Sequence, residues 1–186
     1  MTLDELLRAT TLDVLLLRMY GQPLCAEYHP VLVSQWSKYY FMCFWPCVLQ
    51  GWPERSAAWQ SVRVTLNDRG LPASMSLLDV GSSPCAEQLL DDHLRPLIER
   101  LARYAKVPPG VFWSNAGDAL EQALPAFAEV RWAHALLTPA EAARPRRDSL
   151  QGTVNYTAGG QRKVRACCLA CQVPGIGHCA HCPLQD

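Results

Sequence analysis

The sequence lacks an excess of charge of either sign. Its 186 residues carry 17 Lys and Arg against 17 Asp and Glu, so the formal net charge is zero. A protein that binds nucleic acid non-specifically needs surplus positive charge to displace counterions from the phosphates. We therefore expect no nucleic-acid partner. The length suits one domain, or one domain with a small appendage.

The sequence also lacks long apolar runs. Its most apolar stretch, residues 31–49, is far from the roughly 20 consecutive apolar residues that a membrane span needs. Polar residues and a proline interrupt it, namely Ser34, Gln35, Ser37, Lys38 and Pro46. The first 13 residues are acidic, whereas a secretion signal begins with basic residues and continues with an apolar block. We expect a cytoplasmic protein without a membrane span.

Helical periodicity covers most of the first 125 residues. Apolar spacing predicts helices over residues 3–20, 30–49, 83–105 and 112–124, the first of them opened by a capping box of Thr2 and Glu5. Pro46 is expected to kink the second helix or end it early, and Pro96 to disturb the third. A short helical turn is expected at residues 139–143.

Two segments have the alternation of strands. Residues 61–78 alternate apolar and polar residues on either side of Asn67-Asp-Arg-Gly70, which predicts a β-hairpin. Residues 153–156 are predicted to form a further short strand. We expect an α+β fold, mostly helical with a small antiparallel β-sheet. Residues 1–150 would form a helix-rich domain, and residues 151–186 a C-terminal segment packed on it.

The nine cysteines are unevenly placed. Four are scattered over the first 150 residues, and five fall within the last 20: Cys167, Cys168, Cys171, Cys179 and Cys182. An odd total in a chain without an export signal argues against a disulfide framework. The dense group therefore favours a metal site over a set of buried free thiols.

The spacing allows two ligand sets. Cys167, Cys168, Cys179 and Cys182 have the pattern C-C-x10-C-x2-C and supply the four thiolates of a [2Fe–2S] cluster. Exchanging Cys167 for Cys171 gives C-x2-C-x7-C-x2-C, the spacing of a zinc knuckle. The adjacent pair can serve one cluster only if the backbone turns sharply there, because neighbouring side chains in a strand point to opposite faces. Spacing alone does not choose between the two sets.

The C-terminal pattern resembles the signature of the ferric-siderophore reductases of the FhuF type. The shared features are C-C-x10-C-x2-C ending in Cys-Pro-Leu, a basic stretch before the first pair, and Pro174-Gly175 between the pairs. Upstream, Trp113-Ser-Asn115 is similar to a Trp-x-Asn segment of that family. The resemblance implies a [2Fe–2S] cluster on Cys167, Cys168, Cys179 and Cys182. Cys171 is an additional thiol that the family pattern does not require.

The resemblance further implies a cytoplasmic enzyme that reduces Fe(III) in a siderophore, such as one of the hydroxamate type. Its electron donor would be a low-potential protein such as a ferredoxin or flavin reductase. Expected contacts with substrate or donor are Trp113, Asn115, Arg162 and Arg165. The neutral charge leaves room for weak association with the inner membrane. The alternatives are a [2Fe–2S] electron carrier for another enzyme and a zinc-stabilised binding module.

Overall fold

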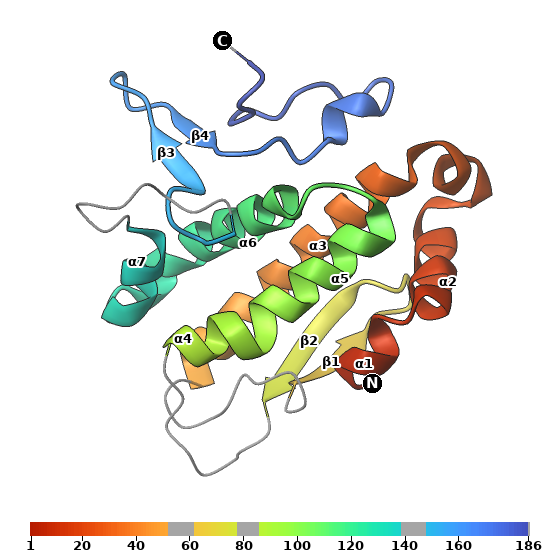
Figure 1. Cartoon of the computed structure of the whole chain (residues 1–186), viewed down its shortest axis with the longest axis horizontal. Coiled ribbons are helices and arrows are strands. Elements are labelled where there is room, and N and C mark those ends of the chain that lie inside the picture. Colours follow the sequence, from red (N-terminus) through yellow and green to blue (C-terminus); the bar gives the residue numbers. More distant parts are fainter. Residues whose placement is uncertain (52–61, 78–85, 139–147, 186) are drawn as a thin grey trace.

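The computed structural model describes residues 1–51, 62–77, 86–138 and 148–185. Figure 1 shows a helical body, with the β1–β2 hairpin on one side and the C-terminal segment, in blue, lying across another. The predicted α+β fold is confirmed, and the described residues form two small antiparallel sheets. Within these ranges, no helix combines the length and apolarity that crossing a membrane requires.

Helices account for most of the elements, and the two sheets come from separate parts of the chain. In chain order the elements are α1 (Leu3–Leu6), α2 (Ala9–Tyr20), α3 (Gln22–Gly51), β1 (Val62–Leu66), β2 (Pro72–Leu77), α4 (Ala86–Leu89), the π-helical turn η2 (Leu90–Leu94), α5 (Arg95–Ala105), α6 (Pro109–Ala123), the 3₁₀ turn η3 (Leu124–Phe127), α7 (Arg131–Leu137), β3 (Val154–Tyr156), β4 (Arg162–Val164) and the 3₁₀ turn η4 (Ala170–Gln172).

The N-terminal capping box is confirmed, but the helix after it is shorter than predicted. The Thr2 hydroxyl accepts a hydrogen bond from the Glu5 amide at 3.2 Å, and the Glu5 carboxylate accepts one from the Thr2 amide at 2.8 Å. The chain then becomes extended at Arg8, so the single helix predicted over residues 3–20 is wrong. The amino group of Met1 donates to the Val64 carbonyl, which ties the start of the chain to β1.

Helix α3 is the centre of the core. Non-helical dihedral angles at Tyr28 divide it into two helical pieces, and the second piece contains the helix predicted over residues 30–49, with Pro30 in its first turn. The expectation that Pro46 ends the helix early is wrong, because the helix continues to Gly51. Trp45 beside it is fully buried, and its indole donates to the Ala116 carbonyl of α6 at 2.7 Å. This packing offsets the lost backbone hydrogen bond.

The predicted hairpin is confirmed as β1 and β2, whose register pairs Val62 with Leu77 and Val64 with Met75. Its turn depends on Asn67, whose side-chain oxygen accepts hydrogen bonds from the amides of Arg69 and Leu71. The hairpin packs on α3. The β1–β2 hairpin lies away from the C-terminal segment (Figure 1). The other two strands, β3 and β4, belong to that segment.

The third predicted helix contains a π-helical turn directly before Pro96. His93 lies in that turn, fully buried, with its Nε2 2.9 Å from the Tyr40 hydroxyl. Helix α6 begins at Pro109, three residues earlier than predicted, because proline suits the first turn of a helix. Helix α7 was not predicted. The proposed helix start at residues 83–84 and the turn at 139–143 lie outside the described residues.

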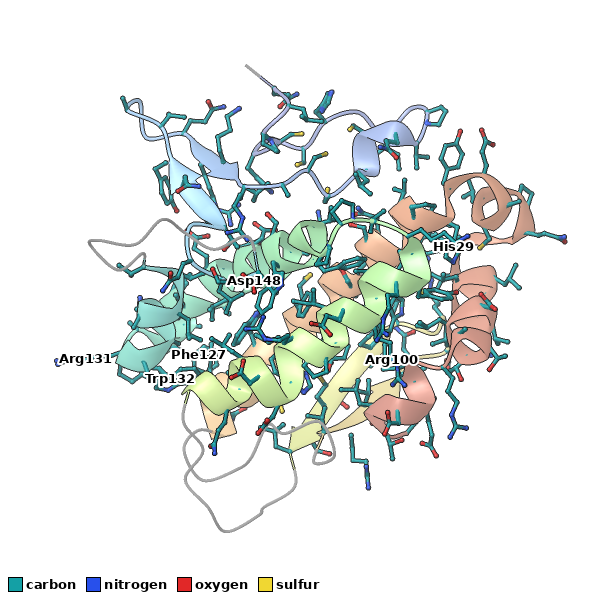
Figure 2. All side chains as sticks on the ribbon, viewed as in Figure 1. His29, Arg100, Phe127, Arg131, Trp132 and Asp148 are labelled. Atoms are coloured by element: carbon teal, nitrogen blue, oxygen red, sulfur yellow. The ribbon has the colours of Figure 1, made fainter. Side chains whose placement is uncertain are left out.

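Ion pairs at the surface join elements that are distant in sequence, and one residue of each of two such pairs, Arg100 and Asp148, is labelled in Figure 2. Arg100 of α5 pairs with Asp4 of α1 at 2.9 Å. Asp148, where the described chain resumes, pairs with Arg95 of α5 at 3.0 Å. The second pair joins the start of the C-terminal segment to the helical body.

Candidate metal centre

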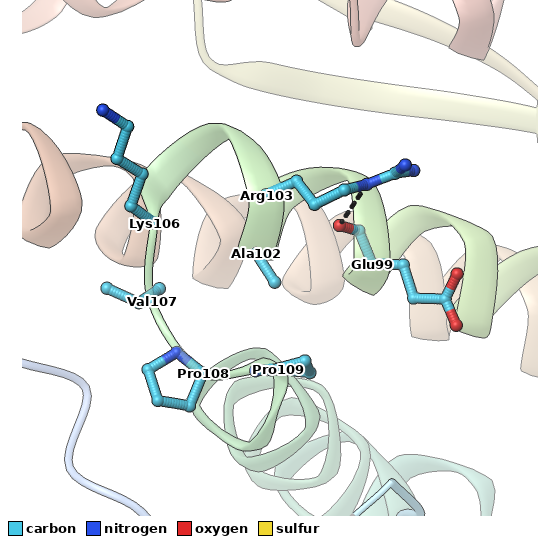
Figure 3. A pocket seen from close by; sticks show the side chains of 7 residues that line it. All are labelled: Glu99, Ala102, Arg103, Lys106, Val107, Pro108 and Pro109. Carbon is cyan, nitrogen blue, oxygen red and sulfur yellow. Dashed lines mark hydrogen bonds between the residues drawn. The ribbon is translucent and has the colours of Figure 1, made fainter.

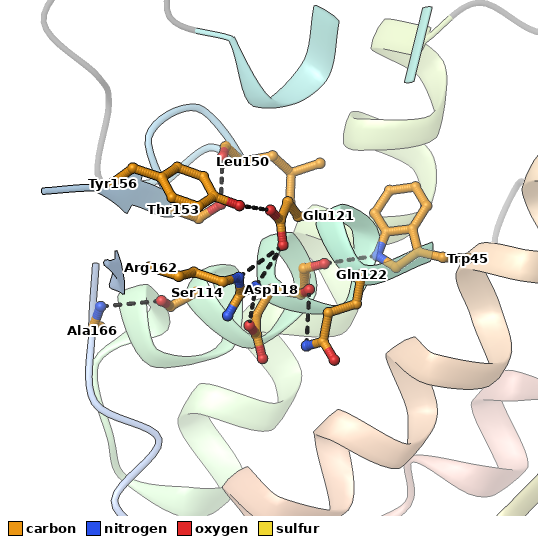
Figure 4. Close-up of polar contacts among 11 residues, drawn as sticks. Trp45, Ser114, Asp118, Glu121, Gln122, Leu150, Thr153, Tyr156, Arg162 and Ala166 are labelled. Carbon is orange, nitrogen blue, oxygen red and sulfur yellow. Dashed lines mark hydrogen bonds and ion pairs between the residues drawn. The ribbon is translucent and has the colours of Figure 1, made fainter. Parts of the chain in front are cut away.

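The C-terminal segment is attached to α6 through a small sheet and the half-buried Arg162. β3 and β4 pair antiparallel, and β3 is the short strand predicted at residues 153–156. The Arg162 guanidinium lies 2.6 Å from Asp118 and 2.7 Å from Glu121, both on α6 (Figure 4). The Tyr156 hydroxyl donates to the same Glu121 carboxylate. The three side chains joined by these ion pairs are at most 24% exposed.

The other basic residues of the segment bind carbonyl groups. Lys163 Nζ donates to the carbonyls of Cys182 and Gln185. The Arg165 guanidinium donates to the carbonyls of Gln151 and Ser149, each at 2.9 Å. Arg162 and Arg165, expected as contacts for a substrate or donor, therefore make contacts that hold the cysteine segment together.

The turns around the cysteines depend on special backbone conformations. Leu169, directly after the adjacent pair, is left-handed with φ 68°. The Leu169 amide points back to the Cys167 sulfur at 3.3 Å. The Cys182 amide donates to the Cys179 carbonyl at 3.0 Å, closing the tight turn expected for C-x2-C. Gly175 and Gly177 also have positive φ, which lets the chain reverse between the two pairs.

The structure brings the four predicted cysteines together as two pairs. The sulfurs of Cys167 and Cys182 are 3.7 Å apart. Two thiolates on one tetrahedral metal, each about 2.3 Å from it, are separated by about 3.8 Å. Cys168 and Cys179 line one small cavity together with Lys38. Each pair thus combines one of the adjacent cysteines, Cys167 or Cys168, with one cysteine of the later C-x2-C motif.

The extra thiol, Cys171, lies on the 3₁₀ turn η4. Its sulfur is 3.8 Å from that of Cys167, the cysteine that the zinc set leaves out. Within the described residues, no three His, Cys, Asp or Glu side chains are grouped so that they could hold one metal ion.

The two pairs differ in electrostatics. Burial raises the pKa of the Cys167 thiol to about 12, against the effect of the Leu169 amide. Burial also raises the pKa of Cys179, and a nearby Cys168 thiolate adds to the shift. For Cys168, burial acts in the same direction, but hydrogen bonds from the Ala170 amide and the Lys38 ammonium outweigh it and lower the pKa. A metal must therefore displace the protons of Cys167 and Cys179.

Helices α3 and α6 form the floor beneath the adjacent cysteines. The Ser34 hydroxyl and the Gln35 amide both donate to the Cys168 carbonyl, at 2.9 and 2.8 Å. The Ser114 hydroxyl accepts from the Ala166 amide at 3.1 Å (Figure 4). These supporting roles were not predicted, because a serine in a helix has no local signal for a partner that is distant in the sequence.

Trp113 and Asn115, also expected as substrate contacts, lie in the interior. Their exposed fractions are 2% and 3%. The Asn115 amide donates to oxygens of Ser34 and Ser37 on α3. The Trp113 ring lies 5.9 Å from the Arg95 guanidinium. Both residues are therefore held by protein groups in the interior.

An open groove of about 590 Å³ lies where α5 meets α6. Figure 3 shows its apolar floor of Val107, Pro108 and Pro109, with Arg103 and Lys106 beside it. None of the cysteines lines it. It is therefore separate from the candidate metal centre.

A comparison with protein families finds a match over most of the chain. The family model described as "Ferric iron reductase FhuF-like transporter" matches residues 34–163. The chain belongs to this FhuF-like family. The match begins at Ser34 and includes Gln35, Lys38 and Asn115, but it ends before Cys167. No curated protein matches the chain.

Membership in the FhuF-like family supports a ferric iron reductase type of role and an iron–siderophore substrate in general. Because the matched range contains the residues that support Cys168, the family's region includes the floor of the candidate metal centre as well as the helical body.

Proposed function

We propose that this FhuF-like protein is a siderophore-iron reductase that holds a [2Fe–2S] cluster on Cys167, Cys168, Cys179 and Cys182. The observation that carries the proposal is the meeting of these thiols as two pairs, with Cys167 and Cys182 3.7 Å apart and Cys168 and Cys179 on one cavity. When bound, such a cluster supplies single electrons at low potential.

The chemistry needed is a one-electron reduction. Fe(III) in a siderophore gains one electron and becomes Fe(II), and the siderophore is released intact. Hard oxygen donors hold Fe(II) far less tightly than Fe(III), so the electron alone makes the iron releasable. No covalent bond of the organic ligand breaks, and the chain needs no nucleophile or general acid. A low-potential donor such as a ferredoxin or flavin reductase would supply the electron.

The chain's own residues have three tasks in this function. The first task is to bind the cluster through the four cysteines. Cys168 and Cys182 are buried, and Cys167 and Cys179 are half-buried, so one side of the site is near solvent. Lys38 places a positive charge beside Cys168 and Cys179. Arg162 fixes the segment on α6 through Asp118 and Glu121. The substrate can then approach from the solvent side.

Metal content tests the cofactor. The protein purified without oxygen should contain about two irons and two sulfides per chain and show a [2Fe–2S] EPR signal after reduction. Cys171→Ser should keep this content, and Cys167→Ser should lose it. Cys43→Ser is the matched control, because Cys43 donates to the Pro72 carbonyl far from the centre. Stoichiometric zinc that disappears in Cys171→Ser would refute the iron–sulfur assignment.

Electron transfer tests the substrate. The reduced protein, mixed in a stopped-flow instrument with ferric hydroxamate, ferric catecholate or ferric citrate, should be oxidised rapidly by at least one siderophore. A chelator specific for Fe(II) should trap one iron per electron. Slow oxidation by every ferric chelate, with rapid oxidation by a protein acceptor, would instead identify an electron carrier.

A further inference from the structure

The backbone of Cys168 is held by two side chains from one turn of α3. The Ser34 hydroxyl and the Gln35 amide donate to its carbonyl oxygen at 2.9 and 2.8 Å. A carbonyl oxygen has two lone pairs, so both are used. The hydroxyl and amide come from neighbouring residues, and together they fix the direction of the carbonyl as well as its position.

Asn115 of helix α6 in turn holds Ser34, one of the two donors to the Cys168 carbonyl. The Asn115 amide nitrogen lies 3.1 Å from the Ser34 carbonyl and 3.0 Å from each of the Ser34 and Ser37 hydroxyls, and its two hydrogens are shared among these three acceptors. Ser34 and Ser37 are completely buried, and Asn115 is 3% exposed. A buried polar group that loses its partner is costly, so each member holds the others in place.

The fixed carbonyl of Cys168 also fixes the direction of the Leu169 amide, because both groups belong to one planar trans peptide. Leu169 itself has a left-handed backbone at φ 68°, which is unfavourable for a non-glycine residue and persists only where surrounding contacts impose it. The Leu169 amide points away from the Cys168 carbonyl, toward the Cys167 sulfur at 3.3 Å. The orientation of both adjacent cysteines therefore depends on the Cys168 carbonyl.

We propose that Ser34, Gln35 and Asn115 are positioning residues that preset the adjacent cysteines for metal binding; we name them the Cys168 clamp. The inference rests on the proposed function for its purpose, but the clamp is formed by the polypeptide alone. It gives Asn115 a role in positioning a ligand from the interior of the protein, without contact with the siderophore.

Hydrogen–deuterium exchange on the metal-free protein tests the clamp directly. In Ser34→Ala and in Gln35→Met, backbone amides of residues 166–172 should exchange roughly three- to tenfold faster, since each variant removes one hydrogen bond to Cys168. The double variant should exchange faster still. Gln122→Met is the matched control, because Gln122 donates to the Asp118 carbonyl on α6 and makes no described contact with the cysteine segment. Equal exchange in Gln35→Met and Gln122→Met would overturn the proposal.

The loaded protein gives a second readout. Gln35→Met should release iron to a chelator roughly three- to tenfold faster than wild type and shift the midpoint potential, whereas Gln122→Met should do neither. Identical release and potential in these two variants would also overturn the clamp. If Ser34→Ala does not fold, Gln35→Met alone tests the clamp, because Gln35 is half-buried. A wild-type protein without iron and sulfide would refute the proposed function, while the exchange experiment would still decide the clamp.

Discussion

Lys38 places its positive charge next to two of the candidate ligands. It donates to the Cys168 thiolate and acts electrostatically on Cys179. A [2Fe–2S] cluster with four thiolates has a formal charge of about −2 and gains one more negative charge on reduction. A cation at this position should therefore stabilise the reduced state more than the oxidised one.

The prediction is that Lys38→Met lowers the midpoint potential by tens of millivolts, where about 59 mV corresponds to a tenfold change in the one-electron equilibrium. Lys38→Arg should stay close to wild type, because it keeps the charge. EPR-monitored redox titration measures both. An unchanged potential in Lys38→Met would show that the ammonium does not act on the cluster.

At this scale the sequence predicts ligands better than it predicts their support. C-C-x10-C-x2-C is a local pattern, and the tight Cys179–Cys182 turn was expected from it. In the sequence, Ser34 and Lys38 only interrupt an apolar helix. Their role could not be predicted, because their partner Cys168 is distant in sequence and only the folded chain brings them together. Asn115 was singled out by resemblance, which did not show that it is buried.

At the scale of elements, α6 positions the cysteine segment through a close approach at Gly117. A Cβ atom there would overlap the side chain of Thr153, which is fully buried and donates to the Leu150 carbonyl at 2.7 Å (Figure 4). Any larger residue at position 117 must push the segment that leads into β3 away from α6.

Gly117→Ala is therefore predicted to destabilise the protein by about 1–3 kcal/mol and to loosen the segment. Gly110→Ala in the same helix is the control. Its Cβ would meet nothing within 4 Å, so stability should stay the same or rise by up to about 1 kcal/mol. Urea unfolding measures both variants. Equal stability of the two variants would contradict the close packing of α6 on Thr153.

The ion pairs of Arg162 make the attachment of β4 dependent on pH. Burial would raise the pKa of Glu121, but hydrogen bonds from Tyr156 and Arg162 outweigh it, so the pKa lies below its ordinary 4.5. A carboxyl whose pKa is lower in the folded state stabilises the fold above its unfolded pKa of 4.5. This contribution is lost as the pH falls through the folded pKa.

Glu121→Gln should accordingly lower the free energy of unfolding by about 1 kcal/mol at pH 7. The difference from wild type should shrink as the pH falls below 4.5. Urea unfolding of both proteins between neutral pH and a pH about one unit below that value tests this. A difference that stays constant with pH would mean that Glu121 contributes through its shape and not through its charge.

The elements were predictable where the signal is local. The capping box, the β1–β2 hairpin and the strand β3 follow from sequence pattern, and the structure contains them. The continuous passage of α3 through Pro46 was not predictable, because it depends on the burial of Trp45 and its bond to Ala116 on another helix. The π-helical turn before Pro96 depends likewise on packing of His93 against Tyr40.

For the whole molecule, the core and the candidate metal centre are separate. The described core is formed by buried residues of the helices and the β1–β2 hairpin with Leu150, and it contains none of the five C-terminal cysteines. Cys168 and Cys182 are buried outside it. Metal binding should therefore order the cysteine segment without being required for the helical body to fold.

The corresponding prediction concerns removal of the metal. Stripping the protein with a chelator under reducing conditions should leave the far-UV circular dichroism of the helices nearly unchanged and lower the melting temperature. Protease cleavage should increase within residues 162–185 and stay slow within α3 and α5, because the segment loses a cross-link that joins its two cysteine pairs. Cys179→Ser should behave like the stripped protein, since it removes one ligand from the pair that faces Lys38. Loss of most helical signal on stripping would mean that the metal stabilises the core itself, and that the helix-rich domain does not fold independently of its C-terminal segment.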